Sequence, residues 1–489
     1  MLMPMDNLLH KCCMEVGIVT SGSTTVYAPI QFYKKAEGYA VEEQLAVIKD
    51  DSIQEGLFFG VIRRVTKLEP IVKDRVRTPF IDRPEIMDPS LLMPYTSAVV
   101  RFYGMINVHK GTIDEVTQVV TPGSKVYVIK DGSFLSNFIK ANNKIIIGSH
   151  KYSGWEVPLD PTYVQYHIGV FGATGMGKSR LIRGLIDELI KSGFRIIVFD
   201  HSGVDYTTYY KDYAVGSKAI SISPPTIASV LASKARLPWQ SYGEYLDVAV
   251  LTYVMGDGDK GGLVNKRLER KWNKQEFLRH LRQSMSKMSA REATVHKASL
   301  FIDYFVDDEF FEELNKRSVH PGDIVRNSLE RGLTVIDMSQ DTDLVVKQAI
   351  VADVISEAWD MVKRGEINVP ARLVFIIDEA QNYVPEDSWT ICKDPIETTS
   401  REGRKWGLSL ILASQRMARD IASNVRANIG TVFFSRLPTQ GDLRELSGYM
   451  DLADVNDSVL TQLSVREFFV TGLMNPLRKP LLIKVKEVR

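Results

Sequence analysis

The residues best suited to chemistry form the run Gly172–Ser179, whose sequence is GATGMGKS. Its three glycines let successive backbone N–H groups turn inward around phosphate oxygens without interference from a Cβ atom. Lys178 can reach the outer phosphates of a nucleotide, and the Ser179 hydroxyl is a suitable ligand for Mg²⁺. This pattern predicts a loop that binds a nucleotide together with a divalent metal ion.

The residues on either side of the loop support this prediction, because they place it between a strand and a helix. An apolar run over 167–171 precedes the loop, and apolar residues after it recur at helical spacing as far as Gly193. Such a helix points the positive end of its dipole at the phosphates. The predicted nucleotide-binding residues are Gly172, Ala173, Thr174, Gly175, Met176, Gly177, Lys178, Ser179 and Arg180.

A second group of polar residues follows a second apolar strand. Residues 373–377 read LVFII, and Asp378 and Glu379 come directly after them. A carboxylate at the end of such a strand can hold Mg²⁺ beside a phosphate loop, so Asp378 is predicted to share the metal with Ser179. Glu379 is placed to orient and deprotonate an attacking water, which makes it the predicted general base. The two motifs together predict ATP hydrolysis.

Other polar residues near the predicted strand ends allow more than one interpretation. The amide of Gln381 can sense the γ-phosphate, although it could equally begin a helix. Gln415 follows the strand predicted over 408–413, and we interpret it as the sensor of hydrolysis, with a plain loop glutamine as the alternative, because that strand end faces the nucleotide crevice. Asp200 and His201 end another predicted strand and would line the site, but His201 could equally be a turn residue.

A basic segment, TSREGRKWG, occupies residues 399–407. In ring-forming ATPases an arginine of the neighbouring subunit often stabilises the charge of the transition state, a contribution of ~10³–10⁵ in rate. Arg404 is the predicted residue for this catalytic role, and Arg401 is the alternative. The alternative interpretation is that these arginines have no catalytic role and belong to a solvated basic face or to a salt bridge with Glu402.

Length and composition limit the class of protein. A chain of 489 residues is too long for one ordinary core, and 44% hydrophobic with 25% charged residues is typical of a folded soluble protein. The net charge of +1 favours neither acidic nor basic partners. Its 3 cysteines suggest neither a disulfide framework nor a zinc site. Without a long apolar stretch, the chain is expected to be cytoplasmic and not inserted in a membrane.

Changes in the pattern of apolar, charged and turn-forming residues divide the chain into segments. Short β-rich runs between turn residues predict a small antiparallel barrel or sandwich near the N-terminus, and unbroken apolar strands alternating with helices predict a parallel sheet covered on both faces. A charged, almost strand-free stretch interrupts the α/β pattern. The predicted segments are an N-terminal β-barrel for assembly or partner docking at 1–150, the first part of the core at 151–224, a helical insertion at 225–325, the second part of the core at 326–475 and a C-terminal tail at 476–489.

These motifs together resemble the HerA branch of the HerA/FtsK family of P-loop ATPases. The resemblance rests on HIGVFGATGMGKS, FDHSGVDY, FIIDEAQNY and REGRKWGLSLILASQR, and it covers most of the chain. It implies an α/β fold with a RecA-like P-loop ATPase core, an inserted helical subdomain and an N-terminal small β-barrel. Gln381 stands where many relatives have His, and Asp205 stands where an acidic–aromatic pair is usual.

The resemblance also implies a function. It points to a homohexameric, ATP- and Mg²⁺-dependent translocase or helicase on double-stranded DNA. Such a motor works with a NurA-type nuclease in DNA-end resection and repair, with Mre11–Rad50 as a further partner and no membrane. Each ATP would lie between subunits, with Lys178, Ser179, Asp378 and Glu379 from one subunit and Arg404 from the next.

Two questions stay open at the level of sequence. The densest basic stretch of the insertion, Lys260–Lys274, could grip DNA or form a charged helix face. The chain could also be a motor for viral genome packaging or conjugative transfer, or an ATP-dependent scaffold that recruits a nuclease. A scaffold of that kind would hydrolyse ATP without responding to DNA.

Overall fold

The computed structural model of the chain contains two compact units. Unit 1 comprises residues 1–162, 175–184 and 431–488, and unit 2 comprises residues 163–174 and 185–430 together with Arg489. The finer division into five segments stays a prediction. The structure describes residues 5–53, 56–72, 79–88, 90, 92–139, 143–255 and 271–487.

The N-terminal part of unit 1 is a closed antiparallel β-barrel. Its strands follow the order β2-β1-β7-β3-β4-β5-β6, and pairing of β2 with β5 closes the barrel and leaves β6 on its outside. Every second residue of β5 is buried, which is the pattern of a strand with one face toward a core. The strands are β1 (Cys13–Val19), β2 (Tyr27–Phe32), β3 (Leu45–Lys49), β4 (Gly56–Leu68), β5 (Tyr95–Asn107), β6 (Thr112–Asp114) and β7 (Lys125–Ile129). The prediction of a small N-terminal barrel is confirmed.

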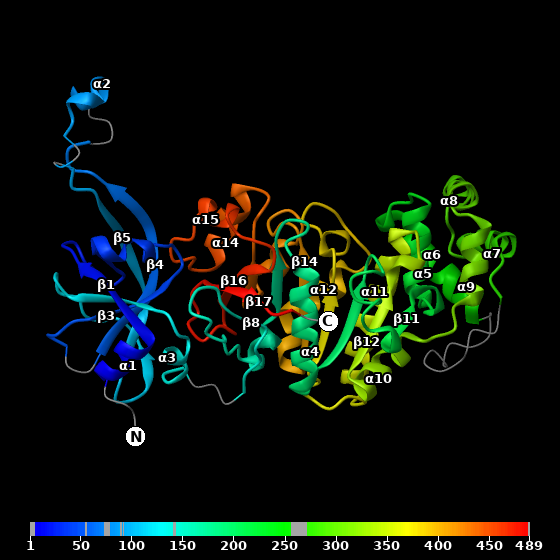
Figure 1. Cartoon of the computed structure of the whole chain (residues 1–489). Coiled ribbons are helices and arrows are strands. Elements are labelled where there is room, and N and C mark those ends of the chain that lie inside the picture. The colour runs from blue at the N-terminus through cyan, green and yellow to red at the C-terminus, as the bar shows by residue number, and fades with distance from the viewer. Residues whose placement is uncertain are drawn as a thin grey trace. The chain divides into compact units, whose positions relative to one another are not determined.

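Strands β4 and β5 continue beyond the barrel as a ribbon, and the short helix α2 (Pro79–Asp82) lies near its tip (Figure 1). Apolar side chains in the segment that connects these two strands, among them Ile81, Ile86 and Met93, are exposed. At the barrel itself, α1 (Met5–Cys12) contacts α3 (Ser133–Ser136).

The rest of unit 1 is a small antiparallel sheet in the order β15-β16-β17-β8. Arg63 forms a buried ion pair with Glu43 of the barrel at 3.0 Å, and it joins the barrel to this part of the chain by donating to the Leu452 carbonyl over 3.1 Å. The Tyr103 hydroxyl donates to the Pro480 carbonyl over 2.5 Å. The elements are β8 (Gly148–His150), β15 (Thr431–Phe434), α14 (Gln440–Tyr449), α15 (Asp457–Thr461), β16 (Glu467–Gly472) and β17 (Leu481–Val485).

Unit 2 is built around a parallel sheet in the order β11-β12-β10-β13-β14-β9. Strands β9, β13 and β14 are buried along their whole length, as expected for strands covered on both faces. The strands are β9 (Ile168–Phe171), β10 (Arg195–Asp200), β11 (Ala214–Gly216), β12 (Leu333–Asp337), β13 (Leu373–Ile377) and β14 (Leu408–Ser414). This is the RecA-like α/β core that the sequence predicts.

Helices connect these strands, and a group of them is inserted between β11 and β12. The connecting helices are α4 (Lys178–Lys191), whose residues up to Gly184 belong to unit 1, and α10 (Pro321–Arg331), α11 (Leu344–Lys363), α12 (Lys393–Trp406) and α13 (Ser423–Arg426). The inserted helices gather beside β11 and β12 (Figure 1). They are α5 (Pro224–Lys234), α6 (Trp239–Met255), α7 (Lys274–Lys287), α8 (Glu292–Phe305) and α9 (Asp308–Lys316).

The inserted helices form a subdomain with an aromatic core. Tyr253 packs against Trp272 and Phe277, with ring centroids 5.0 Å and 5.4 Å apart, and Phe277 packs against Phe311 at 5.7 Å. Of the basic stretch Lys260–Lys274, residues 260–270 lie outside the part that the structure describes. No helix among the described residues has the length and hydrophobicity needed to cross a membrane.

Short 3₁₀ helices complete the described structure, mostly at turns between the larger elements. They are η1 (Lys34–Tyr39), η2 (Pro84–Ile86), η4 (Pro161–Tyr166), η5 (Lys211–Tyr213), η6 (Ser217–Ala219), η7 (Met338–Gln340) and η8 (Ala380–Asn382).

Candidate nucleotide-binding and hydrolysis site

The predicted phosphate loop joins a strand to a helix, as its sequence requires. Strand β9 ends at Phe171, and α4 begins at Lys178. Gly175 and Gly177 have φ angles of +82° and +96°, the left-handed region that glycine enters without steric cost. Met176 is buried between these two glycines. Lys178, Ser179 and Arg180 form the first turn of α4, where helical N–H groups have no partner within the helix.

The predicted acidic and sensor residues come together because the strands of unit 2 are parallel and in register. Phe199 of β10 pairs with Ile377 of β13, and Ile377 pairs with Leu412 of β14. Ser414 of β14 pairs in turn with Phe171 of β9. The carboxyl ends of these strands therefore meet at one edge of the sheet, which is where ligands bind in open α/β sheets.

A cluster of three carboxylates lies at this edge. Asp200, Asp205 and Asp378 each offer one oxygen, and these oxygens all lie within 4.8 Å of one another. Burial, followed by the charges of Glu379 and Asp205, raises the pKa of Asp378 to about 7. Closely spaced carboxylate oxygens are the ligands that Mg²⁺ and Ca²⁺ prefer, so the cluster fits a divalent cation.

Asp200 has a second role that its sequence position does not reveal. It is completely buried, and it accepts hydrogen bonds from the N–H groups of Gly203, Tyr206 and Thr207 at 3.0, 3.0 and 2.8 Å. These contacts fold the segment after β10 back on itself and bring Asp205 toward Asp378. Asp205 was not among the predicted metal ligands, because only this fold of the loop places it there.

Glu379 lies at the end of β13 in a left-handed conformation with a φ of +49°. Its N–H donates to Asp378 Oδ1 over 3.0 Å, and its carboxylate accepts a hydrogen bond from the amide of Gln381. Left-handed residues other than glycine are uncommon and cluster at functional sites. The backbone thus turns sharply after Asp378, so the side chains of the two acids do not point to opposite faces of the sheet as successive strand residues do.

Gln381 connects Glu379 to the end of β14. Its amide oxygen lies 3.0 Å from the hydroxyl of Ser414, and that hydroxyl is also close to a carboxylate oxygen of Asp420. Gln415, the predicted sensor, is the half-buried residue that follows Ser414. Its role stays a prediction, and Gln381 is the residue that links the two strand ends.

His201 packs beside the carboxylate cluster. Its Nδ1 lies 2.8 Å from the hydroxyl of Tyr383, and Lys347 donates to the His201 carbonyl over 3.2 Å. Burial and the charge of Lys347 lower the pKa of His201, against the opposing effect of Glu379. His201 therefore packs against Tyr383 next to the carboxylates, and it also lies in the turn after β10.

Arg404 and Arg401 lie away from the carboxylates of their own chain. Both are exposed on α12, which ends at Trp406, just before β14 begins. The seven residues of β14 place its two ends about 20 Å apart at ~3.3 Å per residue. The guanidinium of Arg404 stacks on Tyr166, with its Cζ 3.9 Å from the ring centroid. Either arginine could therefore serve the site of another copy more easily than its own.

His167 connects the middle of α12 to the sheet. Its Nε2 lies 2.9 Å from the Ser400 carbonyl, and its Nδ1 accepts a hydrogen bond from the Leu410 N–H over 3.1 Å. This arrangement requires a neutral ring with the proton on Nε2. Burial lowers the pKa of His167 to about 4, so the ring is neutral at physiological pH.

Acid is expected to destabilise the fold through His167. Between pH 6.5 and 4 the unfolded chain binds a proton at this position and the folded chain does not, so stability falls as the pH decreases. The loss should be about 2 kcal/mol at pH 5. Denaturant unfolding at pH 7.5 and pH 5 should show a smaller loss for His167→Gln than for the wild type. An equal loss in both proteins would contradict this account.

Comparison with known proteins points to one family. The model of the HerA helicase central domain matches residues 145–358. The chain is 21% identical to the DNA double-strand break repair helicase HerA of Sulfurisphaera tokodaii, over 96% of this chain and 93% of that protein. Its identity to the HerA of Saccharolobus solfataricus is also 21%, over 96% and 92%. These similarities support a HerA-type ATPase.

Solved structures of low sequence identity share the fold of this chain. VirB4 of Thermoanaerobacter pseudethanolicus has a TM-score of 0.54 and 16% identity, over 72% of this chain and 98% of that one. The plasmid coupling protein TrwB in complex with the ATP analogue ADPNP has a TM-score of 0.51 and 16% identity, over 73% and 93%. The similarity to HerA helicases supports an enzyme that binds nucleotide and hydrolyses ATP.

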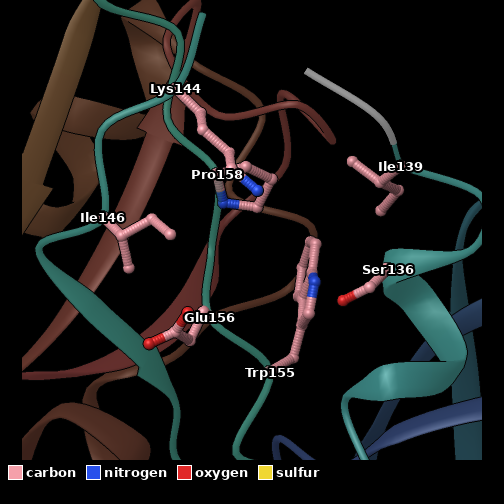
Figure 2. A pocket seen from close by; sticks show the side chains of 7 residues that line it. All are labelled: Ser136, Ile139, Lys144, Ile146, Trp155, Glu156 and Pro158. Carbon is pink, nitrogen blue, oxygen red and sulfur yellow. The ribbon is translucent and has the colours of Figure 1, made fainter. Parts of the chain in front are cut away.

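A small cavity in unit 1 is separate from the predicted site residues. Its volume is about 230 Å³, and Figure 2 shows the side chains that line it. Apolar groups and two charged groups meet there, and Glu156 also pairs with Lys486 over 2.8 Å. The lining residues are Ser136, Ile139, Lys144, Ile146, Trp155, Glu156 and Pro158. The cavity contributes no residue to the predicted chemistry.

Proposed function

We propose that this chain is a HerA-type ATPase and forms a homohexameric motor that uses Mg²⁺ and ATP to move along double-stranded DNA. The observation that carries the proposal is the similarity of 96% of the chain to DNA double-strand break repair helicases HerA. The α/β core, the glycine conformations of the predicted phosphate loop and the carboxylate cluster support the same proposal, because a hydrolytic site of this kind needs a phosphate loop and an acidic metal site.

The proposed chemistry assigns one task to each residue. Lys178 binds the outer phosphates, and Glu379 accepts the proton of the attacking water. Gln381 holds the carboxylate of Glu379 in place through its amide. Asp378 and Ser179, with Asp205 as an additional ligand, would hold Mg²⁺. The metal ion, when bound, neutralises part of the charge on the phosphates.

The proposed active site is completed by a neighbouring subunit. Arg404 is exposed and lies far from the acids of its own chain, as expected for an arginine that acts on the next copy. Stacking on Tyr166 holds its guanidinium in one orientation. Hydrolysis at such a site changes the contact between subunits, and this is the step that would move DNA. The number of subunits follows from the family resemblance.

The proposed biological setting is DNA-end resection and repair in the cytoplasm, with a NurA-type nuclease and with Mre11–Rad50. The N-terminal barrel, with its exposed ribbon of β4 and β5, is the proposed docking module. Contacts to DNA should be made mainly to phosphates, so binding should be independent of sequence and should weaken steeply with salt. VirB4 and the plasmid coupling protein TrwB share the fold, but at 16% identity that likeness gives no reason to prefer a conjugative function.

Stimulation of ATP hydrolysis by DNA tests this proposal against the scaffold alternative. A motor is expected to hydrolyse ATP several times faster when duplex DNA is added, and to lose this stimulation at high salt. The measurement is steady-state phosphate release with and without a long blunt duplex. An ATPase rate that does not change with DNA at low salt would contradict the motor and favour the scaffold.

A further inference from the structure

The turn that precedes β16 lies directly against the phosphate loop. The backbone N–H of Arg466 donates to the carbonyl of Met176 over 2.9 Å. A Cβ atom added to Gly177 would lie 3.5 Å from Cγ of Arg466 and 3.6 Å from its backbone nitrogen. All of these atoms belong to unit 1. Arg466 therefore contacts the loop through its backbone and the base of its side chain.

The backbone of Arg466 is held in an unfavourable conformation. Its φ angle is +71°, in the left-handed region that residues with a Cβ rarely adopt. Such a conformation persists only where the surroundings fix it, and it is frequent at functional sites. Here the Arg466 carbonyl accepts from the Val485 N–H over 2.9 Å. The neighbouring Glu467, 4% exposed, accepts from Lys151 over 2.9 Å and from the Ser464 N–H over 3.0 Å.

The side chain of Arg466 has a partner that can easily be replaced. Its guanidinium lies 2.8 Å from Glu487, and the two side chains are 20% and 84% exposed. An ion pair with such an exposed carboxylate has little net stability. Phosphate oxygens accept two parallel hydrogen bonds from a guanidinium and compete well with a single carboxylate contact. An arginine in this position can therefore exchange one anion for another.

We propose that Arg466 is a further nucleotide-binding residue that acts on the site of its own subunit. Its guanidinium pairs with Glu487 when the loop is empty and with a phosphate of the nucleotide when the loop is filled. The inference rests on the proposed role of Gly172–Arg180 as the phosphate loop. It differs from the role of Arg404, which is assigned to the neighbouring copy and to the transition state.

Nucleotide titration of Arg466→Asn tests the proposal. Asparagine tolerates a left-handed backbone, so this variant keeps the turn and removes the charge. With a fluorescent non-hydrolysable ATP analogue and no DNA, its Kd should be about tenfold or more above that of the wild type. Its melting temperature should match that of the wild type. Arg466→Lys should recover part of the affinity, because it keeps the charge. An unchanged Kd in Arg466→Asn would overturn the proposal.

Removal of the competing carboxylate gives an effect of the opposite sign. Glu487→Gln should bind the same analogue about two- to fivefold more tightly, because the guanidinium of Arg466 no longer has to break an ion pair before it binds phosphate. Lys486→Gln is the matched control: it breaks the neighbouring surface pair with Glu156 and should leave the Kd unchanged. Weaker or unchanged binding by Glu487→Gln would contradict the exchange. A wild-type chain that binds the analogue but does not move DNA would contradict the motor and leave the role of Arg466 intact.

Discussion

The Glu379→Gln variant should hydrolyse ATP about 10²–10⁴-fold more slowly than the wild type while binding nucleotide with similar affinity. Glutamine preserves the shape of the side chain and removes the group that accepts the proton from water. The left-handed backbone at Glu379 and its hydrogen bond from Gln381 fix this carboxylate beside Asp378. Steady-state phosphate release and nucleotide titration on the same preparation measure the two properties.

Glu402→Gln is a suitable control for this experiment. Glu402 is an exposed acid on α12, outside the group of residues to which we assign chemistry, so its replacement should leave turnover unchanged. Wild-type turnover in Glu379→Gln would show that another group accepts the proton. A parallel loss of nucleotide binding would show that the variant disturbs the site itself, and the assignment of Glu379 as general base would then be wrong.

Replacing Arg404 with Ala is expected to slow hydrolysis by about 10³-fold or more, the effect of removing an arginine finger. The cause would lie between subunits, because Arg404 and the carboxylates of its own chain are at opposite edges of the sheet. Phosphate release measures the loss. Lys405→Ala removes the adjacent exposed cation and should leave the rate unchanged.

Mixing two inactive variants separates action on the neighbouring copy from action within one chain. In rings that contain both Arg404→Ala and Lys178→Ala subunits, some sites combine an intact Lys178 with an intact Arg404. Activity should therefore reappear on mixing, although neither variant is active alone. The absence of any recovery would contradict the assignment of Arg404, and the same experiment with Arg401→Ala tests the alternative.

The sequence predicts the parts of the site that lie within one continuous motif. Gly175 and Gly177 have the positive φ angles that the loop requires, and Asp378 and Glu379 follow a buried strand as their pattern indicates. The small N-terminal barrel and the RecA-like core were also predictable, because alternating and continuous apolar strands leave distinct patterns. These features depend on local spacing, which a single sequence records.

The features that sequence analysis missed depend on contacts that only the folded chain makes. Asp205 joins the cluster only because Asp200 accepts three backbone hydrogen bonds from the loop between them and the residues after it. Gln381 contacts Ser414 because β13 and β14 are neighbours in the sheet. Arg466 reaches the phosphate loop from a turn before β16 that carries no recognisable motif. Tertiary structure, and not local pattern, fixes each of these positions.

Displacement of a third strand from a DNA triplex tests the central claim most directly, because a motor that moves along duplex DNA removes that strand without unwinding the duplex. The wild-type chain, with or without a partner nuclease, is expected to release the labelled strand in the presence of Mg²⁺ and ATP. Glu379→Gln and Arg404→Ala should release almost none. Hydrolysis of ATP by the wild type without any release, both with and without the nuclease, would contradict the account.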